Sequence, residues 1–141
     1  MLYGSSVIKA WSNTQKCVAL SSGEAEYYGI VRGSAMGIGI RNMYEDLGVV
    51  VGIVVRTDAS AAKGIASRRG AGKIRHIEVA QLWVQEKVAT GEIKLVKVST
   101  SENVADALTK YVTGDGIRMQ IEGAGMEVAT GRSNMALRVQ S

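Results

Sequence analysis

The fold is decided by residues 11–27, WSNTQKCVALSSGEAEY, in which a turn-forming stretch and a short apolar run lead into the start of a helix. Residues 7–11 and 17–21 predict two short strands, and the turn-forming residues between them predict that these strands pair as a hairpin. Ser21, Ser22 and Glu24 follow the capping-box pattern, in which the Glu24 carboxylate reaches back to the backbone at the cap. A long helix is therefore expected from about residue 22 to 47, with Gly48 as its stop.

Strands and helices alternate along the chain that follows. Residues 49–55 form a valine-rich apolar run typical of a strand covered on both faces, and residues 93–98 alternate as a further strand. Short helices are expected at residues 58–67 and 101–110, and a second long helix at 74–88. This order predicts one α/β domain, residues 1–112, whose mixed sheet is flanked by helices. Residues 113–141 are glycine-rich and are predicted to form a C-terminal tail.

Composition limits both the class of protein and the class of site. No apolar run reaches the roughly 18 residues of a membrane span, and no secretory leader is visible, so we expect an intracellular protein, cytoplasmic or nuclear, without a membrane partner. One cysteine and one histidine, Cys17 and His76, do not suffice for a Cys/His zinc site, so any bound metal should be a hard, oxygen-liganded ion. The net charge of +4 is compatible with a polyanionic partner.

Three acidic positions are candidates for such a metal site. Asp58 ends a buried strand, Asp106 lies on the last short helix, and either Glu24 or Glu26 opens the long helix. Glu24 and Glu26 point about 200° apart on a helix, so they cannot both face one site, and the capping role of Glu24 favours Glu26. Two alternatives stay open: Asp58 caps the helix it begins, which we favour on the residues alone, and Asp106 is an ordinary solvated side chain.

Five cations lie in or beside residues 68–73, which we call the basic loop, and His76 follows them. Phosphate backbones are bound by such clusters without sequence readout, but a solvated surface loop has the same composition, and we weigh the two readings evenly. A lone histidine is more often structural than functional. The nucleic-acid-binding candidates are Lys63, Arg68, Arg69, Lys73, Arg75 and His76.

Four segments, in order, resemble copia-type retrotransposon ribonuclease H domains. Residues 11–27 resemble the pattern W-x-S-K-K-Q-x-x-V-A-L-S-S-T-E-A-E-Y, and residues 57–62, TDASAA, resemble C-D-N-x-S-A. Residues 75–78, RHIE, resemble K-H-I-D, and residues 104–110, VADALTK, resemble the A-D-x-L-T-K ending. The resemblance covers residues 5–112 and identifies the chain as similar to this part of a Pol polyprotein.

The resemblance implies an RNase H-like fold that hydrolyses the RNA strand of RNA–DNA hybrids. It implies two Mg²⁺ ions, with Mn²⁺ as a substitute, held by four carboxylates, of which three fall on Glu26, Asp58 and Asp106. The first carboxylate belongs to a strand before the hairpin, and this strand is missing because the chain opens inside the second. Activity is therefore expected to be impaired. The implied partners are the hybrid and the reverse transcriptase portion of the same polyprotein.

Two other functions are compatible with the residues: a catalytically dead relic or nucleic-acid-binding module, and an unrelated α/β interaction domain. A missing central strand would leave sheet edges unpaired, and such edges invite pairing. We expect residues 117–121 or 135–139 of the tail to fill the gap as a strand, or two chains to fill it for each other.

Overall fold

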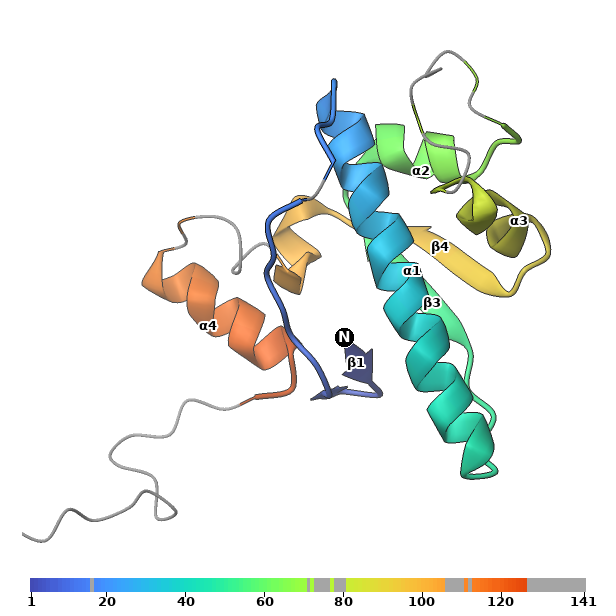
Figure 1. Ribbon diagram of the computed structural model, residues 1–141. Helices are drawn as coiled ribbons and strands as arrows, with labels where there is room; N and C mark the ends of the chain where they lie inside the picture. Colours follow the sequence, from blue (N-terminus) through green and yellow to red (C-terminus); the bar gives the residue numbers. More distant parts are fainter. Residues whose placement is uncertain are drawn as a thin grey trace, which may run out of the picture. The chain divides into compact units, whose positions relative to one another are not determined.

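A computed structural model describes residues 1–15, 17–70, 72, 77, 81–105, 111 and 113–126. The described residues form a mixed α/β structure with two small sheets. Figure 1 shows the helices and strands along the chain. It divides into two compact units: Asn13–Asn103, called the core unit, and Met1–Ser12 with Val104–Ser141, called the terminal unit. The α/β class predicted from the sequence is confirmed, whereas the domain boundary after residue 112 stays a prediction.

The core unit is built around two parallel strands. It contains α1 (Ser22–Asp46), β3 (Ile53–Thr57), α2 (Ser60–Ala66), α3 (Trp83–Ala89) and β4 (Ile93–Lys97). Ile53 pairs with Ile93 and Thr57 with Lys97, so the strands are in register along their whole length. Because parallel strands cannot be joined by a tight turn, the chain crosses between them through α2 and α3. The strand predicted at 93–98 and the short helix at 58–67 are confirmed within a residue or two.

One face of this sheet carries the apolar core. The buried cluster takes Tyr27, Ile30 and Val31 from α1, Ala62, Ile65 and Ala66 from α2, Val84 from α3, and Ile77. Val55 and Leu95, which are paired in register, pack against it. Side chains alternate along a strand, so the next pair, Val54 and Lys94, points to the opposite face, where Val54 is 54% exposed.

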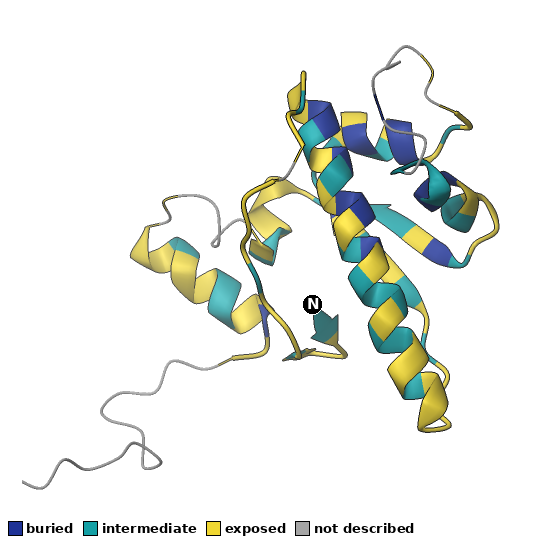
Figure 2. Cartoon of the chain, viewed as in Figure 1, coloured by how far each residue is buried: buried dark blue, intermediate teal, exposed yellow. Residues whose placement is uncertain are grey.

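The long helix begins and ends where the sequence predicts. Ser21 is the N-cap, and its side-chain oxygen accepts the Glu24 N–H at 3.2 Å. The helix ends at Asp46, and Gly48 adopts the left-handed φ of +77° that a glycine tolerates after a helix. Figure 2 shows that the buried positions of α1 lie in its first half, while its second half is exposed or half-buried.

The predicted hairpin of residues 7–11 and 17–21 is wrong for the residues that the structure describes. In the terminal unit, β1 (Leu2–Tyr3) pairs antiparallel with β2 (Ser6–Val7) around Gly4, at a φ of +60°. The described residues of 17–21 form no strand. An isolated hairpin is marginal without a buried face, and Val18 is 86% exposed.

Two further predictions differ from the structure. The strand expected at 49–55 begins only at Ile53, after Val50, which is 92% exposed. Residues 117–121 belong to α4 (Gly114–Gly123), so they do not form a gap-filling strand. Ile117 and Ile121 are four residues apart, which places them on one face of a helix. The segment 135–139 lies outside the described residues, and pairing of two chains stays a prediction.

The remaining expected helices are described only in part. Of the second long helix, predicted at 74–88, the structure describes α3 together with Ile77, Gln81 and Leu82. The predicted helix at 101–110 is represented by η2 (Thr100–Glu102), with a capping box formed by Ser99 and Glu102, and residues 106–110 lie outside the description. Among the described helices, none is long and apolar enough to span a bilayer.

Candidate active site

The carboxyl end of β3 presents Asp58 without using it in the helix that follows. The N-cap of α2 is Ala59, and no side chain caps this helix. Thr57, which is buried, stabilises the turn instead, because its Oγ1 accepts the Ala59 N–H at 3.1 Å. The capping role that we favoured for Asp58 is therefore wrong. Its carboxylate is half-buried, and no hydrogen bond or ion pair with another described residue engages it.

The two glutamates at the start of α1 have different surroundings. Glu24 is fully buried, and its carboxylate accepts the Leu20 N–H at 2.9 Å and the Tyr28 hydroxyl at 2.8 Å. This confirms that Glu24 reaches back across the helix start. Glu26 is exposed and, among the described residues, has no hydrogen-bond or salt-bridge partner. Of the two carboxylates, Glu26 is the one that remains available to a ligand.

The packing of α1 on β3 places Glu26 at the level of Asp58. A Cβ atom on Gly37 would lie 3.2 Å from Cγ2 of Ile53, so Gly37 faces the first residue of β3. From Ile53 to Asp58 the chain advances five residues, about 16 Å along a strand. From Gly37 back to Glu26 the helix covers eleven residues, again about 16 Å, and returns to within about 20° of the same face. Since α1 and β3 run in opposite directions (Figure 1), both carboxylates reach the same end of the core unit.

A second close approach fixes this end of the unit. A Cβ atom on Gly23 would lie only 2.8 Å from Cβ of Ala61, so the first turns of α1 and α2 are in direct contact. Glu26 follows Gly23 by three residues, and Asp58 precedes Ala61 by three. The two carboxylates therefore flank a contact that only a glycine permits.

The third predicted ligand, Asp106, lies outside the described residues. Among the residues that are described, no group of three His, Cys, Asp or Glu side chains is close enough to hold a metal ion. The site predicted from Glu26, Asp58 and Asp106 thus stays a prediction. Glu26 and Asp58 do fit one requirement of a Mg²⁺ site, since they offer hard oxygen ligands that no other described residue engages.

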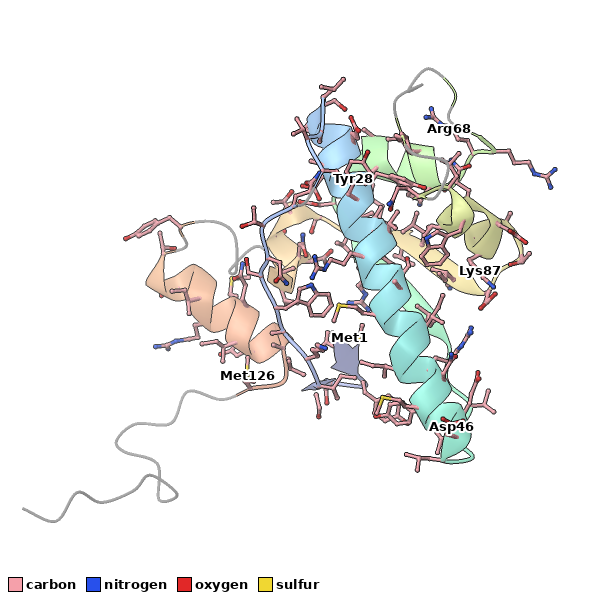
Figure 3. The ribbon with its side chains drawn as sticks, in the orientation of Figure 1. Met1, Tyr28, Asp46, Arg68, Lys87 and Met126 are labelled. Carbon is pink, nitrogen blue, oxygen red and sulfur yellow. The ribbon has the colours of Figure 1, made fainter. Side chains whose placement is uncertain are left out.

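The cations of the basic loop are described at two positions. Arg68 is half-buried and Arg69 exposed, and Lys63 is half-buried on α2. Figure 3 shows Arg68 and Tyr28 at the same end of the core unit. The other predicted nucleic-acid contacts, Lys73, Arg75 and His76, lie outside the described residues.

Tyr27 connects this loop to the carboxylate end. Its ring is fully buried, and its hydroxyl donates to the Gln81 carbonyl at 2.7 Å. Burial raises the pKa of Tyr27 to about 12, and the positive charge of Arg68 opposes this rise. The Arg68 guanidinium is therefore close enough to α1 to influence the residue next to Glu26.

Sequence reasoning missed one residue that organises the loop. Gln85 of α3 is buried and forms three hydrogen bonds with residues 65 and 70. Its only signal in the sequence is its position beside the apolar face of the predicted helix. The bonded residues lie 15 and 20 positions away, a separation that no local pattern reveals.

The chain is similar to segments of transposon polyproteins from plants. It is 34% identical over 117 residues, 82% of its length, to "Retrovirus-related Pol polyprotein from transposon TNT 1-94" of Nicotiana tabacum. It is 29% identical over 105 residues, 72% of its length, to the corresponding proteins from transposons RE1 and RE2 of Arabidopsis thaliana. No protein-family model and no solved structure matches the chain.

These relatives are much longer than the chain, which spans 9% of the tobacco protein and 7% of each Arabidopsis protein. The aligned segment nevertheless includes most of the residues described above, since it covers 82% of the chain. The homologues of this chain are thus retrovirus-related Pol polyproteins from plant transposons.

Proposed function

We propose that the chain is the ribonuclease H part of a retrotransposon Pol polyprotein and hydrolyses the RNA strand of RNA–DNA hybrids with two divalent cations. The homologues support the origin of the chain, and the four ordered motifs support the activity. One structural observation carries the proposal. Glu26 and Asp58 reach the same end of the core unit, while Glu24 and Thr57 perform the local structural roles there.

In this function Glu26, Asp58 and Asp106 would hold Mg²⁺. The bound ions would supply charge neutralisation at the scissile phosphate and activation of a water molecule. The protein contributes the fixed placement of Glu26 and Asp58, because α1 packs against β3 at Gly37 and against α2 at Gly23. The basic loop would hold the phosphate backbone of the hybrid through charge, independently of its sequence.

Metal titration tests the carboxylate assignment. Glu26→Gln, Asp58→Asn and Asp106→Asn should each weaken Mn²⁺ binding by at least about tenfold, the lower range seen even when groups supporting a ligand are removed. Glu45→Gln is the matched control, since Glu45 is an exposed glutamate at the opposite end of α1. Calorimetry on the whole chain measures the affinities. If Glu24→Gln alone weakens binding, the assignment is wrong.

Cleavage of a labelled RNA–DNA hybrid tests the activity itself. We expect slow hydrolysis, since the resemblance implies four carboxylates and this sequence supplies three of them. Whatever rate is measured should be lost in Asp58→Asn and kept in Glu45→Gln. A brisk rate that Asp58→Asn abolishes would show that the fourth carboxylate is dispensable. A rate that is the same in both variants would refute the proposal.

A further inference from the structure

The Gln85 side chain ties the basic loop to α3. Its Nε2 donates to the Ile65 carbonyl at 2.8 Å and to the Gly70 carbonyl at 3.1 Å, and its Oε1 accepts the Gly70 N–H at 2.8 Å. Gln85 is only 6% exposed, so this amide lies out of water with both donors and its acceptor in use. Buried polar groups that are fully paired fix one arrangement of their surroundings.

These bonds hold the chain on both sides of the two arginines. Ile65 is in the last turn of α2, where helix carbonyls lack partners within the helix, and Gln85 satisfies one of them. Gly70, at a left-handed φ of +75°, has both its backbone N–H and its carbonyl bonded to the same amide. Arg68 and Arg69 lie between the two anchored points.

The Arg68 guanidinium is confined as well. A Cβ atom on Gly72 would lie 2.8 Å from Cζ and from Nη1 of Arg68, so the guanidinium packs directly on the Gly72 backbone. On the α1 side, its charge reaches Tyr27. Arg69, by contrast, is exposed. Residues 68–70 therefore present one confined cation and one solvent-facing cation from an anchored backbone.

We propose that Gln85 is a positioning residue, which holds the backbone of residues 67–70 so that Arg68 and Arg69 contact neighbouring phosphates of a nucleic acid. The inference rests on the phosphate contact of the proposed function and assigns to it a residue that touches no ligand. A loop fixed before binding does not lose its freedom on binding, so more of the contact energy appears as affinity. An unanchored loop would let one or both arginines remain solvated.

The salt dependence of binding separates positioning from mere stability. Each phosphate contact adds about 0.9 to the slope of log affinity against log salt, because counterions are released. A variant that is partly unfolded binds more weakly by the same factor at each salt concentration, and its slope is unchanged. A variant that has lost a phosphate contact has a smaller slope. Circular dichroism at each salt concentration verifies that the folded fraction stays constant.

The experiment measures fluorescence anisotropy of a labelled RNA–DNA hybrid with the 141-residue chain, in EDTA so that no hydrolysis occurs. Gln85→Met keeps the volume of the side chain and removes all three hydrogen bonds, and Gln85→Ala serves as the second variant. Arg68→Ala with Arg69→Ala removes the contact itself. Arg56→Ala is the matched control, because Arg56 is an exposed cation on β3.

The expected slope falls by about 1 in both Gln85 variants and by about 2 in the double arginine variant. The Arg56→Ala slope should be closest to that of the unmodified chain. An unchanged slope in both Gln85 variants, beside a reduced slope in the arginine variant, overturns the positioning role and leaves the loop contact intact. An unchanged slope in the arginine variant, or no salt-dependent binding by the unmodified chain, overturns the inference together with the loop contact. The metal titration above is independent of all these outcomes.

Discussion

The two halves of α1 are held in different ways. Residues 22–34 include all the buried positions of the helix: Gly23, Glu24, Tyr27, Ile30, Val31 and Ser34. In residues 35–46 none is buried, and Met43 is 65% exposed. The candidate carboxylates lie at the packed half. A site that must hold cations at fixed distances needs side chains whose backbone is locked by packing, and this half of the helix carries all of its buried residues.

The second half of α1 has no buried residue, and besides the contact of Gly37 with Ile53 it is held by charges. Arg41 forms ion pairs with Glu45 at 3.4 Å and with Glu92 at 2.8 Å, and Lys87 pairs with Glu92 at 2.5 Å. Hydrogen bonds from Lys87, and then from Arg41, lower the pKa of Glu92. Pairs near the surface contribute little to stability. The contrast predicts that mutations of similar size cost much more in the first half of α1 than in the second.

The largest effect is expected when Tyr27 is truncated. Tyr27→Ala should lower the free energy of unfolding by about 3–5 kcal/mol, because it leaves a cavity among the buried side chains of α1 and α2. Met43→Ala, the counterpart in the exposed half, should change it by about 0.5 kcal/mol or less. Urea denaturation of both variants measures the difference. Similar losses in the two variants would show that the halves are equally packed.

The next largest loss of stability is expected at alkaline pH, through ionisation of Tyr27 in the packed half of α1. The pKa of Tyr27 is raised to about 12 in the folded chain, whereas an unfolded tyrosine ionises near 10. The folded chain therefore keeps the Tyr27 proton to higher pH than the unfolded chain does. The stability that this protonated hydroxyl contributes is complete below about pH 10 and is lost as pH rises toward 12. The loss is roughly 1.4 kcal/mol for each unit of pKa difference.

The matched variant for this effect is Tyr27→Phe, which keeps the ring and removes the titrating hydroxyl. Its stability at neutral pH should fall by about 1 kcal/mol through loss of the bond to the Gln81 carbonyl. Between pH 10 and 12 its unfolding free energy should decline less than that of the unmodified chain. Parallel pH profiles for the two proteins would mean that burial does not suppress ionisation of Tyr27.

The same contrast explains which features could be predicted from the sequence. The bounds of α1 follow from local signals, the Ser21 cap and Gly48, and both were predicted correctly. The hairpin failed because a strand depends on a partner and a buried face, which short apolar runs do not guarantee. Capping by Asp58 failed because the helix starts one residue later than a capping Asp58 requires, and Thr57 supports the turn.

The candidate site was predictable in part for the same reason. The opposite facing of Glu24 and Glu26 follows from helix geometry alone, so their different surroundings could be anticipated. The anchoring of the basic loop by Gln85 could not, because it joins α3 to the end of α2 across 15 to 20 residues. Tertiary hydrogen bonds of this kind leave no periodic pattern in a sequence.

An intermediate effect is expected at Glu24. Glu24→Ala removes the acceptor of two part-buried hydrogen bonds, from the Leu20 N–H and the Tyr28 hydroxyl, and each such bond contributes about 0.5–1.5 kcal/mol. Glu45→Ala removes an exposed carboxylate from the other end of α1 and should cost about 0.5 kcal/mol or less. Thermal unfolding of the pair measures the gap. Equal shifts in midpoint would contradict a structural role for Glu24.

The smallest effect is expected when a single methyl group is added to a glycine of α1. The sign of the change in unfolding free energy should differ between the two halves of the helix. Gly39→Ala meets no atom within 4 Å, so it should stabilise the chain by about 0.5–1 kcal/mol through helix propensity alone. Gly23→Ala gains the same propensity but places its Cβ 2.8 Å from Cβ of Ala61, and overpacking of this kind costs about 1–3 kcal/mol. We therefore expect opposite signs at the two glycines. The double variant Gly23→Ala with Ala61→Gly removes the clash, so its loss should be smaller than the sum of the two single losses. Urea denaturation of the unmodified chain, Gly23→Ala, Ala61→Gly and the double variant tests this cycle. Additive effects would show that α1 and α2 are not in contact at Gly23.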